Sequence, residues 1–157
     1  MGKSEFTDAL GWVYEHSPWV AERAWCCKPF KSIEHLQHTM ALIVQSAAES
    51  EQLHLIKAHP DLAARIDMAD ASVKEQTAAG LNTLTSEEYI EFLQLNQNYK
   101  DKFGFPFIIA VKGLNKHLIK EAMQQRIQLN EKSEKAEAIK QINCIAQNRL
   151  SDFINNN

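Results

Sequence analysis

The chain has 157 residues, of which 45% are hydrophobic and 24% are charged, and its formal net charge is −3. This length is enough to bury a core without a disulfide or a structural metal. Lysine and arginine are not concentrated in any segment, which argues against a nucleic-acid partner because that binding depends largely on neutralising phosphates. No apolar run is long enough for a membrane-spanning helix.

The three cysteines, Cys26, Cys27 and Cys144, form no Cys-x-x-Cys pattern of the kind that holds zinc or performs redox chemistry. Their odd number is typical of a reducing compartment. The first residues also lack the apolar stretch of a signal peptide. We therefore expect a cytoplasmic protein that uses no metal and contacts no membrane.

The first part of the chain favours helices. Glycine and proline are scarce, and apolar residues recur at helical spacing around residues 5–16, 19–28 and 32–48. A shorter helix follows and must end near Pro60, because a proline ring disfavours helical backbone at the preceding residue, His59.

Further helix signals follow in the second half. The segment Thr85-Ser-Glu-Glu88 is a capping box that begins a helix, another helix starts from Asn115, and Ser133 can cap the last one. Between them, residues 103–111 are apolar throughout, which predicts a buried and partly extended segment. The whole pattern predicts an all-α fold, a single compact multi-helix domain over residues 1–157 with about seven to nine helices and a frayed end at 154–157.

Among the six histidines, His59 has the most unusual position. It lies at an enforced helix end, directly before a rigid proline, and this arrangement can hold an imidazole proton donor in one direction. A purely structural role for His59 stays open on this evidence. The other five histidines occupy ordinary helix or surface positions.

Two further polar features allow both a structural and a functional interpretation. Ser72-Val-Lys-Glu75 is a capping box, so Ser72 and Glu75 either only begin a helix or also present its N–H groups to an anionic or carbonyl-rich ligand. Arg149 borders the apolar face of the last helix. It either covers apolar surface with its stem or contacts a ligand.

Five motifs, taken in order, resemble the 2-oxo-4-hydroxy-4-carboxy-5-ureidoimidazoline (OHCU) decarboxylase family. They are His59-Pro-Asp-Leu-Ala63; Ser72-x-x-Glu75-Gln76 with Ala79-Gly-Leu81; Leu95-Asn96-x-x-Tyr99; Lys102-Phe-Gly-Phe-Pro-Phe-Ile108; and Ile145-Ala-x-x-Arg149-Leu150. The resemblance extends from Phe6 to about Phe153.

This resemblance implies an all-α enzyme that decarboxylates OHCU to (S)-allantoin during urate degradation, without a cofactor or metal. It implies that His59 is the catalytic proton donor and that Glu75 and Arg149 are the other polar catalytic residues. It also implies a homodimer. The substrate-lining positions it implies are Pro60, Ser72, Val73, Lys74, Glu75, Gln76, Phe107, Ile108, Ile109, Ala110 and Val111.

The sequence departs from the family pattern in two places. Ala64 stands where glycine is common in relatives, and the connector over residues 64–71 is short. Both departures concern a loop and a dimer contact rather than the polar residues. Two other classes of protein remain as alternatives, a helical ligand-binding or regulatory module without catalysis and a helix-turn-helix DNA-binding protein. Intact His59, Glu75 and Arg149 argue against the first, and the lack of a basic recognition helix argues against the second.

Overall fold

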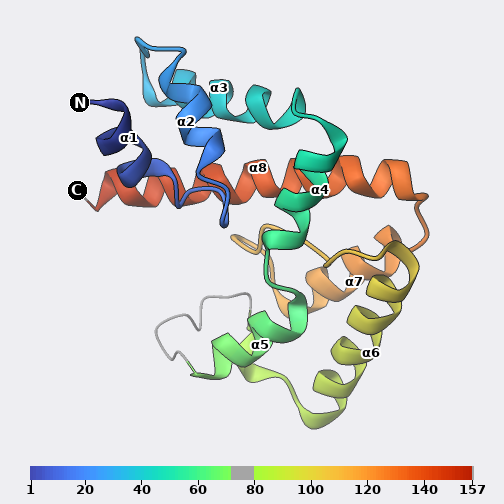
Figure 1. The fold of residues 1–157 in the computed structure, drawn as a ribbon. Helices are drawn as coiled ribbons and strands as arrows, with labels where there is room; N and C mark the ends of the chain where they lie inside the picture. Colours follow the sequence, from blue (N-terminus) through green and yellow to red (C-terminus); the bar gives the residue numbers. More distant parts are fainter. Residues whose placement is uncertain (72–79, 157) are drawn as a thin grey trace. The chain divides into compact units, whose positions relative to one another are not determined.

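The computed structural model describes residues 1–71 and 80–156. Over these residues the chain forms eight α-helices and a short 3-10 helix, and no strand (Figure 1). The predicted all-α class is therefore confirmed. The elements are α1 (Lys3–Leu10), α2 (Trp19–Trp25), α3 (Ile33–Gln45), α4 (Glu49–Ala58), α5 (Leu62–Ala71), η2 (Leu81–Thr83), α6 (Ser86–Phe103), α7 (Lys116–Arg126) and α8 (Glu131–Asn155).

The residues group into two units that pack mainly within themselves. Unit 1 is Met1–His59 together with Ile139–Asn157, and unit 2 is Pro60–Ala138. One boundary therefore falls at the bond between His59 and Pro60, and the other falls within α8. The single domain expected over residues 1–157 stays a prediction.

The core of unit 1 is built from the apolar faces of its helices. Figure 1 shows α1, α2 and α3 beside the C-terminal part of α8. A hydrogen bond of 2.7 Å from the Tyr14 hydroxyl to Asn143 Oδ1 joins the turn after α1 to α8. The buried residues of this core include Phe6, Leu10, Val13, Val20, Ala24, Leu36, Met40, Val44, Ile142 and Leu150.

The first helix is shorter than its apolar spacing predicts. α1 ends at Leu10, and the chain then forms turns in which Val13 and Tyr14 are buried. His16 has a φ of 47°, outside the right-handed helical region, so a continuous helix over residues 5–16 is excluded. This correction matters because the turn presents polar groups to α8.

The capping box at the start of α6 forms as predicted. Thr85 Oγ1 accepts from the Glu88 N–H at 3.1 Å, and Glu88 Oε1 accepts from the Thr85 N–H at 3.0 Å. Glu88 Oε1 also lies 2.8 Å from Lys116 Nζ at the start of α7. The Lys116 ammonium and the Thr85 N–H together lower the pKa of Glu88 to about 2. The Glu88 carboxylate thus contributes to the N-terminal cap of α6 and also links α6 to α7.

Replacing Thr85 with alanine removes the side-chain cap while leaving the Lys116 ion pair in place. The expected result is a loss of about 1 kcal/mol in the free energy of unfolding, measured by urea titration. Ser86→Ala is the matched control, because Ser86 is exposed and makes no cap. An equal loss in both variants would contradict the assignment of Thr85 as the cap.

Two expectations about helix starts need correction. The N–H of Ser133 donates to Asn130 Oδ1 at 2.8 Å, so Asn130 rather than Ser133 caps α8. Residues 64–71 are not a connector, because they belong to α5, and Asp61 Oδ1 accepts from the Ala64 N–H at 2.9 Å. Ala64 therefore lies in a first helical turn, where alanine is favoured over glycine. α8 continues to Asn155, into the tail expected to fray.

The apolar segment after α6 is buried, as predicted. Gly104 ends α6 with a φ of 74°, in the left-handed region that favours glycine. Residues 104–111 then run without helix or strand, and Gly113, with a φ of 81°, precedes the Asn115 cap of α7. Phe105, Phe107, Ile108 and Ile109 are buried in this stretch.

None of the described helices, not even the 25 residues of α8, is both long and apolar enough to cross a membrane.

Candidate active site

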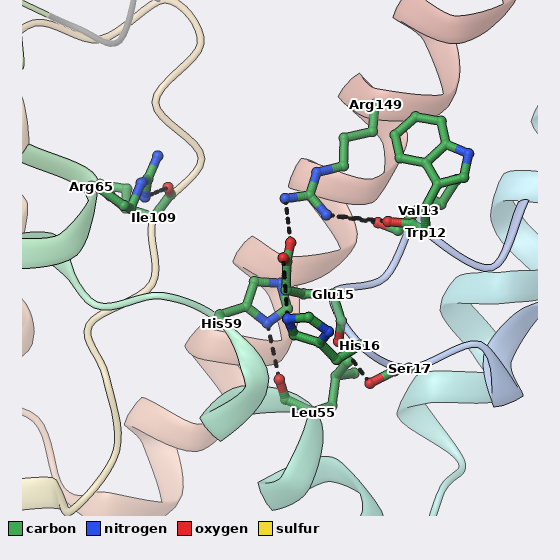
Figure 2. A network of polar contacts seen from close by, with 10 residues as sticks. All are labelled: Trp12, Val13, Glu15, His16, Ser17, Leu55, His59, Arg65, Ile109 and Arg149. Atoms are coloured by element: carbon green, nitrogen blue, oxygen red, sulfur yellow. Dashed lines mark hydrogen bonds and ion pairs between the residues drawn. The ribbon is translucent and has the colours of Figure 1, made fainter. Parts of the chain in front are cut away.

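His59 ends α4 with its ring held in one orientation. Its backbone is extended, with φ −77° and ψ 142°, which is the conformation expected before a proline. The residue is 7% exposed, and Nδ1 lies 2.9 Å from the Leu55 carbonyl oxygen (Figure 2). A carbonyl oxygen only accepts hydrogen bonds, so Nδ1 is the donor, and in the neutral ring Nε2 is the unprotonated nitrogen. The fold thus selects a tautomer as well as a direction.

The two residues after His59 begin unit 2. Pro60 is half-buried, and Asp61 caps α5 through its Oδ1. The other carboxylate oxygen of Asp61 lies 2.8 Å from Lys100 Nζ on α6. The segment His59-Pro-Asp61 therefore ends α4, begins α5 and links α5 to α6.

Arg149 lies on α8 and is anchored to the turn that follows α1. Its Nη2 donates to Glu15 Oε2 at 2.7 Å, and its Nη1 donates to the carbonyl oxygens of Val13 at 3.3 Å and Trp12 at 3.4 Å (Figure 2). Its side chain is 31% exposed. The sequence left open a rim arginine or a ligand contact, and the structure adds a protein partner, Glu15. The contact with Glu15 could not be predicted from the sequence, since no periodicity relates residues 134 positions apart.

The predicted substrate-lining segment Phe107 to Val111 belongs to unit 2, where arginines hold its backbone. Arg126 Nη1 donates to the Ile108 carbonyl at 2.6 Å, and Arg65 Nη1 donates to the Ile109 carbonyl at 3.0 Å. Figure 2 shows the second of these bonds. Phe107 is completely buried, so its side chain is part of the core. The carbonyls of Ile108 and Ile109 are thus held by hydrogen bonds within the protein.

A buried charged network supports this segment. Arg126 lies 2.8 Å through Nε and 2.5 Å through Nη2 from Glu134 Oε1, and the Tyr99 hydroxyl donates to the same oxygen. The Arg126 guanidinium also lies 4.4 Å from the centre of the Phe107 ring, a cation–π contact. Burial, together with the hydrogen bond to Glu134, raises the pKa of Tyr99, so its hydroxyl keeps its proton. Of these residues, Tyr99 and Phe107 lie in sequence motifs, whereas Arg126 and Glu134 do not.

The predicted site residues fall into three groups: those outside the described residues, those in unit 1 and those in unit 2. Ser72, Val73, Lys74, Glu75 and Gln76 lie outside the described residues. His59 and Arg149 belong to unit 1, while Pro60 and residues 107–111 belong to unit 2. Within residues 1–71 and 80–156, no group of three or more His, Cys, Asp or Glu side chains is arranged to hold a metal ion.

Known proteins similar to this chain point to one family. The model of the OHCU decarboxylase family matches residues 1–151. The chain is 48% identical over 151 residues to the OHCU decarboxylase of Halalkalicoccus jeotgali, covering 96% of the chain and 86% of that relative. It is 46% identical to the uric acid degradation bifunctional protein PucL of Bacillus subtilis, covering 98% of the chain and 31% of PucL. The crystal structure of an (S)-allantoin synthase matches with a TM-score of 0.82 at 32% identity, covering 98% of the chain and 51% of that protein.

The all-α fold and these matches define the class of protein first, a helical carboxy-lyase. More particularly, the chain belongs to the OHCU decarboxylase family, because the family model covers nearly its whole length. The resemblance carried by the five motifs is thereby confirmed.

Proposed function

We propose that this chain decarboxylates OHCU to (S)-allantoin and CO2 in urate degradation. The observation that carries the proposal is the family match over residues 1–151, which includes His59 and Arg149. The substrate is a small molecule. From the family resemblance we also propose a cytoplasmic homodimer, and sedimentation of the purified chain at twice its monomer mass is the expected result for the dimer.

The reaction has a defined flow of electrons. One ring carbon of OHCU carries a carboxylate and a hydroxyl, beside a ring C=N bond. When the bond to the carboxylate breaks, CO2 leaves and the electron pair forms a C=C bond to the neighbouring carbon. The C=N pair moves onto nitrogen, which takes a proton. The resulting enol then loses its hydroxyl proton while the ureido-bearing carbon gains one, giving allantoin.

His59 is proposed to deliver the proton to the ureido-bearing carbon. Uncatalysed protonation gives both enantiomers because both faces of the enol are open. One acid fixed in one direction gives only one of them, and imidazole changes its charge near neutral pH. The hydrogen bond from Nδ1 to the Leu55 carbonyl supports this role. Because Nδ1 is engaged in this bond, Nε2 is the ring nitrogen that can bind and release the transferred proton.

Arg149 is proposed to bind the substrate carboxylate and to orient it. An arginine guanidinium matches a carboxylate in charge and in planar geometry. Very tight binding of that group would stabilise the starting state, which does not accelerate the loss of CO2. Arg149 therefore serves best if it orients the group and also meets oxygen charge that develops later.

Glu75 and the lining residues complete the proposal. By family resemblance, Glu75 accepts the hydroxyl proton or holds His59 in its productive tautomer. Pro60, Ser72 to Gln76 and Phe107 to Val111 line the substrate. The arginine hydrogen bonds to the Ile108 and Ile109 carbonyls support the proposal for residues 107–111, because they hold the backbone of this segment in one conformation.

The proposed activity is tested by generating OHCU in situ. Urate oxidase and hydroxyisourate hydrolase convert urate to OHCU, after which this protein is added and the disappearance of OHCU absorbance is followed. The expected result is a rate of OHCU loss that rises in proportion to the amount of protein. A rate equal to the spontaneous one at every protein concentration would instead favour a non-catalytic ligand-binding module.

A further inference from the structure

We infer that Glu15 is a positioning residue that limits how tightly Arg149 holds the substrate carboxylate. The inference rests on the proposed function, because it concerns the carboxylate that this function places at Arg149. None of the sequence motifs contains Glu15, and its role follows from its contact with Arg149.

The contact leaves part of the guanidinium for a ligand. Nη1 is engaged by the carbonyls of Trp12 and Val13, and Nη2 is engaged by Glu15. In the part of the chain that the structure describes, no hydrogen bond from Arg149 Nε is present. A guanidinium presents N–H groups in a planar fork, so the Nε side can still receive a carboxylate. Glu15 therefore holds Arg149 in place and leaves its Nε N–H group available to a ligand.

Glu15 itself is held by its surroundings. Ser17 Oγ donates to the Glu15 carbonyl at 2.9 Å, and the neighbouring Tyr14 is tied to α8 through Asn143. The second carboxylate oxygen of Glu15 lies 3.8 Å from Nε2 of the exposed His16. The carboxylate thus stays beside Arg149 because the turn that carries it is fixed to the same helix.

The charge of Glu15 has a kinetic consequence. Its side chain is 27% exposed and pairs with Arg149, so an approaching carboxylate meets a nearly neutral pair rather than an isolated cation. An isolated cation would bind the substrate more tightly, but the negative charge leaves the carboxylate as CO2 departs. That extra affinity would be lost in the transition state, so it would lower KM and kcat together. The Glu15 charge keeps the carboxylate oriented while avoiding this loss of rate.

Glu15→Gln tests the inference because it keeps a hydrogen-bond acceptor and removes the charge. The expected result is a decrease in KM of about three- to tenfold and a similar decrease in kcat, so that kcat/KM stays within about twofold. The inhibition constant of (S)-allantoin, which has no carboxylate, should also stay within about twofold. Glu15→Asp keeps the charge and should restore KM and kcat to within about twofold of wild type.

A purely structural role predicts a different pattern. If Glu15 only held Arg149 in place, Glu15→Gln would raise KM and lower kcat/KM, and this result would overturn the inference. Glu51→Gln is the matched control, because it removes the carboxylate of another partly exposed ion pair in unit 1, with Arg23, and should leave both constants unchanged. Thermal unfolding of each variant shows whether it is folded. If Glu15→Gln is not folded, Glu15→Ser, which also removes the charge, is measured in its place and should show the same parallel decrease in KM and kcat.

The outcomes separate this inference from the proposed function. If wild-type protein turns over OHCU but Glu15→Gln has the same KM and kcat, only the role of Glu15 is wrong. If the wild-type protein does not turn over OHCU at all, both the proposed function and the role of Glu15 are wrong.

Discussion

Replacing His59 with alanine is expected to lower kcat by about 10²- to 10⁴-fold and to make the allantoin product nearly racemic. The reason is that the variant loses the one acid proposed to protonate the enol from a single face, while Arg149, the residue proposed to bind the carboxylate, is unchanged. The rate is measured by the loss of OHCU, and the handedness of the product is measured by circular dichroism at equal conversion.

The matched control is His54→Ala. His54 lies on the same helix, α4, but is exposed, so its loss should change neither rate nor handedness. His59 is buried, and thermal unfolding must therefore show that His59→Ala is still folded. A folded His59→Ala protein that keeps both the wild-type rate and the (S) product would exclude His59 as the proton donor.

Replacing Arg126 with methionine is expected to cost about 3–5 kcal/mol in the free energy of unfolding. Glu134 is completely buried, so the substitution leaves a carboxylate without its counter-charge in the interior. It also removes the donor to the Ile108 carbonyl. Urea titration followed by far-UV circular dichroism measures the loss.

Two controls separate this effect from loss of an arginine in general. The double variant Arg126→Met with Glu134→Gln removes both charges and should recover at least about half of the lost stability, because the cost comes mainly from the uncompensated charge. Arg23→Met breaks the partly exposed pair with Glu51 and should cost less than about 1 kcal/mol. Equal losses for Arg23→Met and Arg126→Met would contradict the importance of burial.

The features that the sequence predicts well are local. The capping box of Thr85 and Glu88 acts within one helical turn, and the effect of Pro60 on His59 acts across one peptide bond. Local rules of this kind need no knowledge of the rest of the fold. The buried apolar segment after α6 could also be predicted, because its phenylalanine and isoleucine side chains disfavour exposure.

Local rules fail where two candidates compete. Ser133 and Asn130 are both good N-cap residues. In the structure the earlier residue, Asn130, is the cap, so α8 begins at Glu131. Periodicity similarly extended α1 too far, because Val13 is buried in a turn and not on a helical face. A repeating apolar pattern reports burial, and burial does not require a helix.

The site depends most on contacts that no local rule predicts. Glu15 and Arg149 are 134 residues apart, and Tyr99 and Glu134 are 35 residues apart. Nothing in the spacing of these residues indicates that they meet, because folding alone brings them together. The motifs therefore identified His59 and Arg149 as candidates, but the partners that orient them became known only from the structure.

The proposed function is tested most directly by the enantiomeric composition of the allantoin that the wild-type protein forms from OHCU. Protonation of the enol from a single face predicts (S)-allantoin in large excess from the first turnovers, read as the sign and size of the circular dichroism signal while OHCU is consumed. Racemic allantoin formed at the spontaneous rate would contradict it.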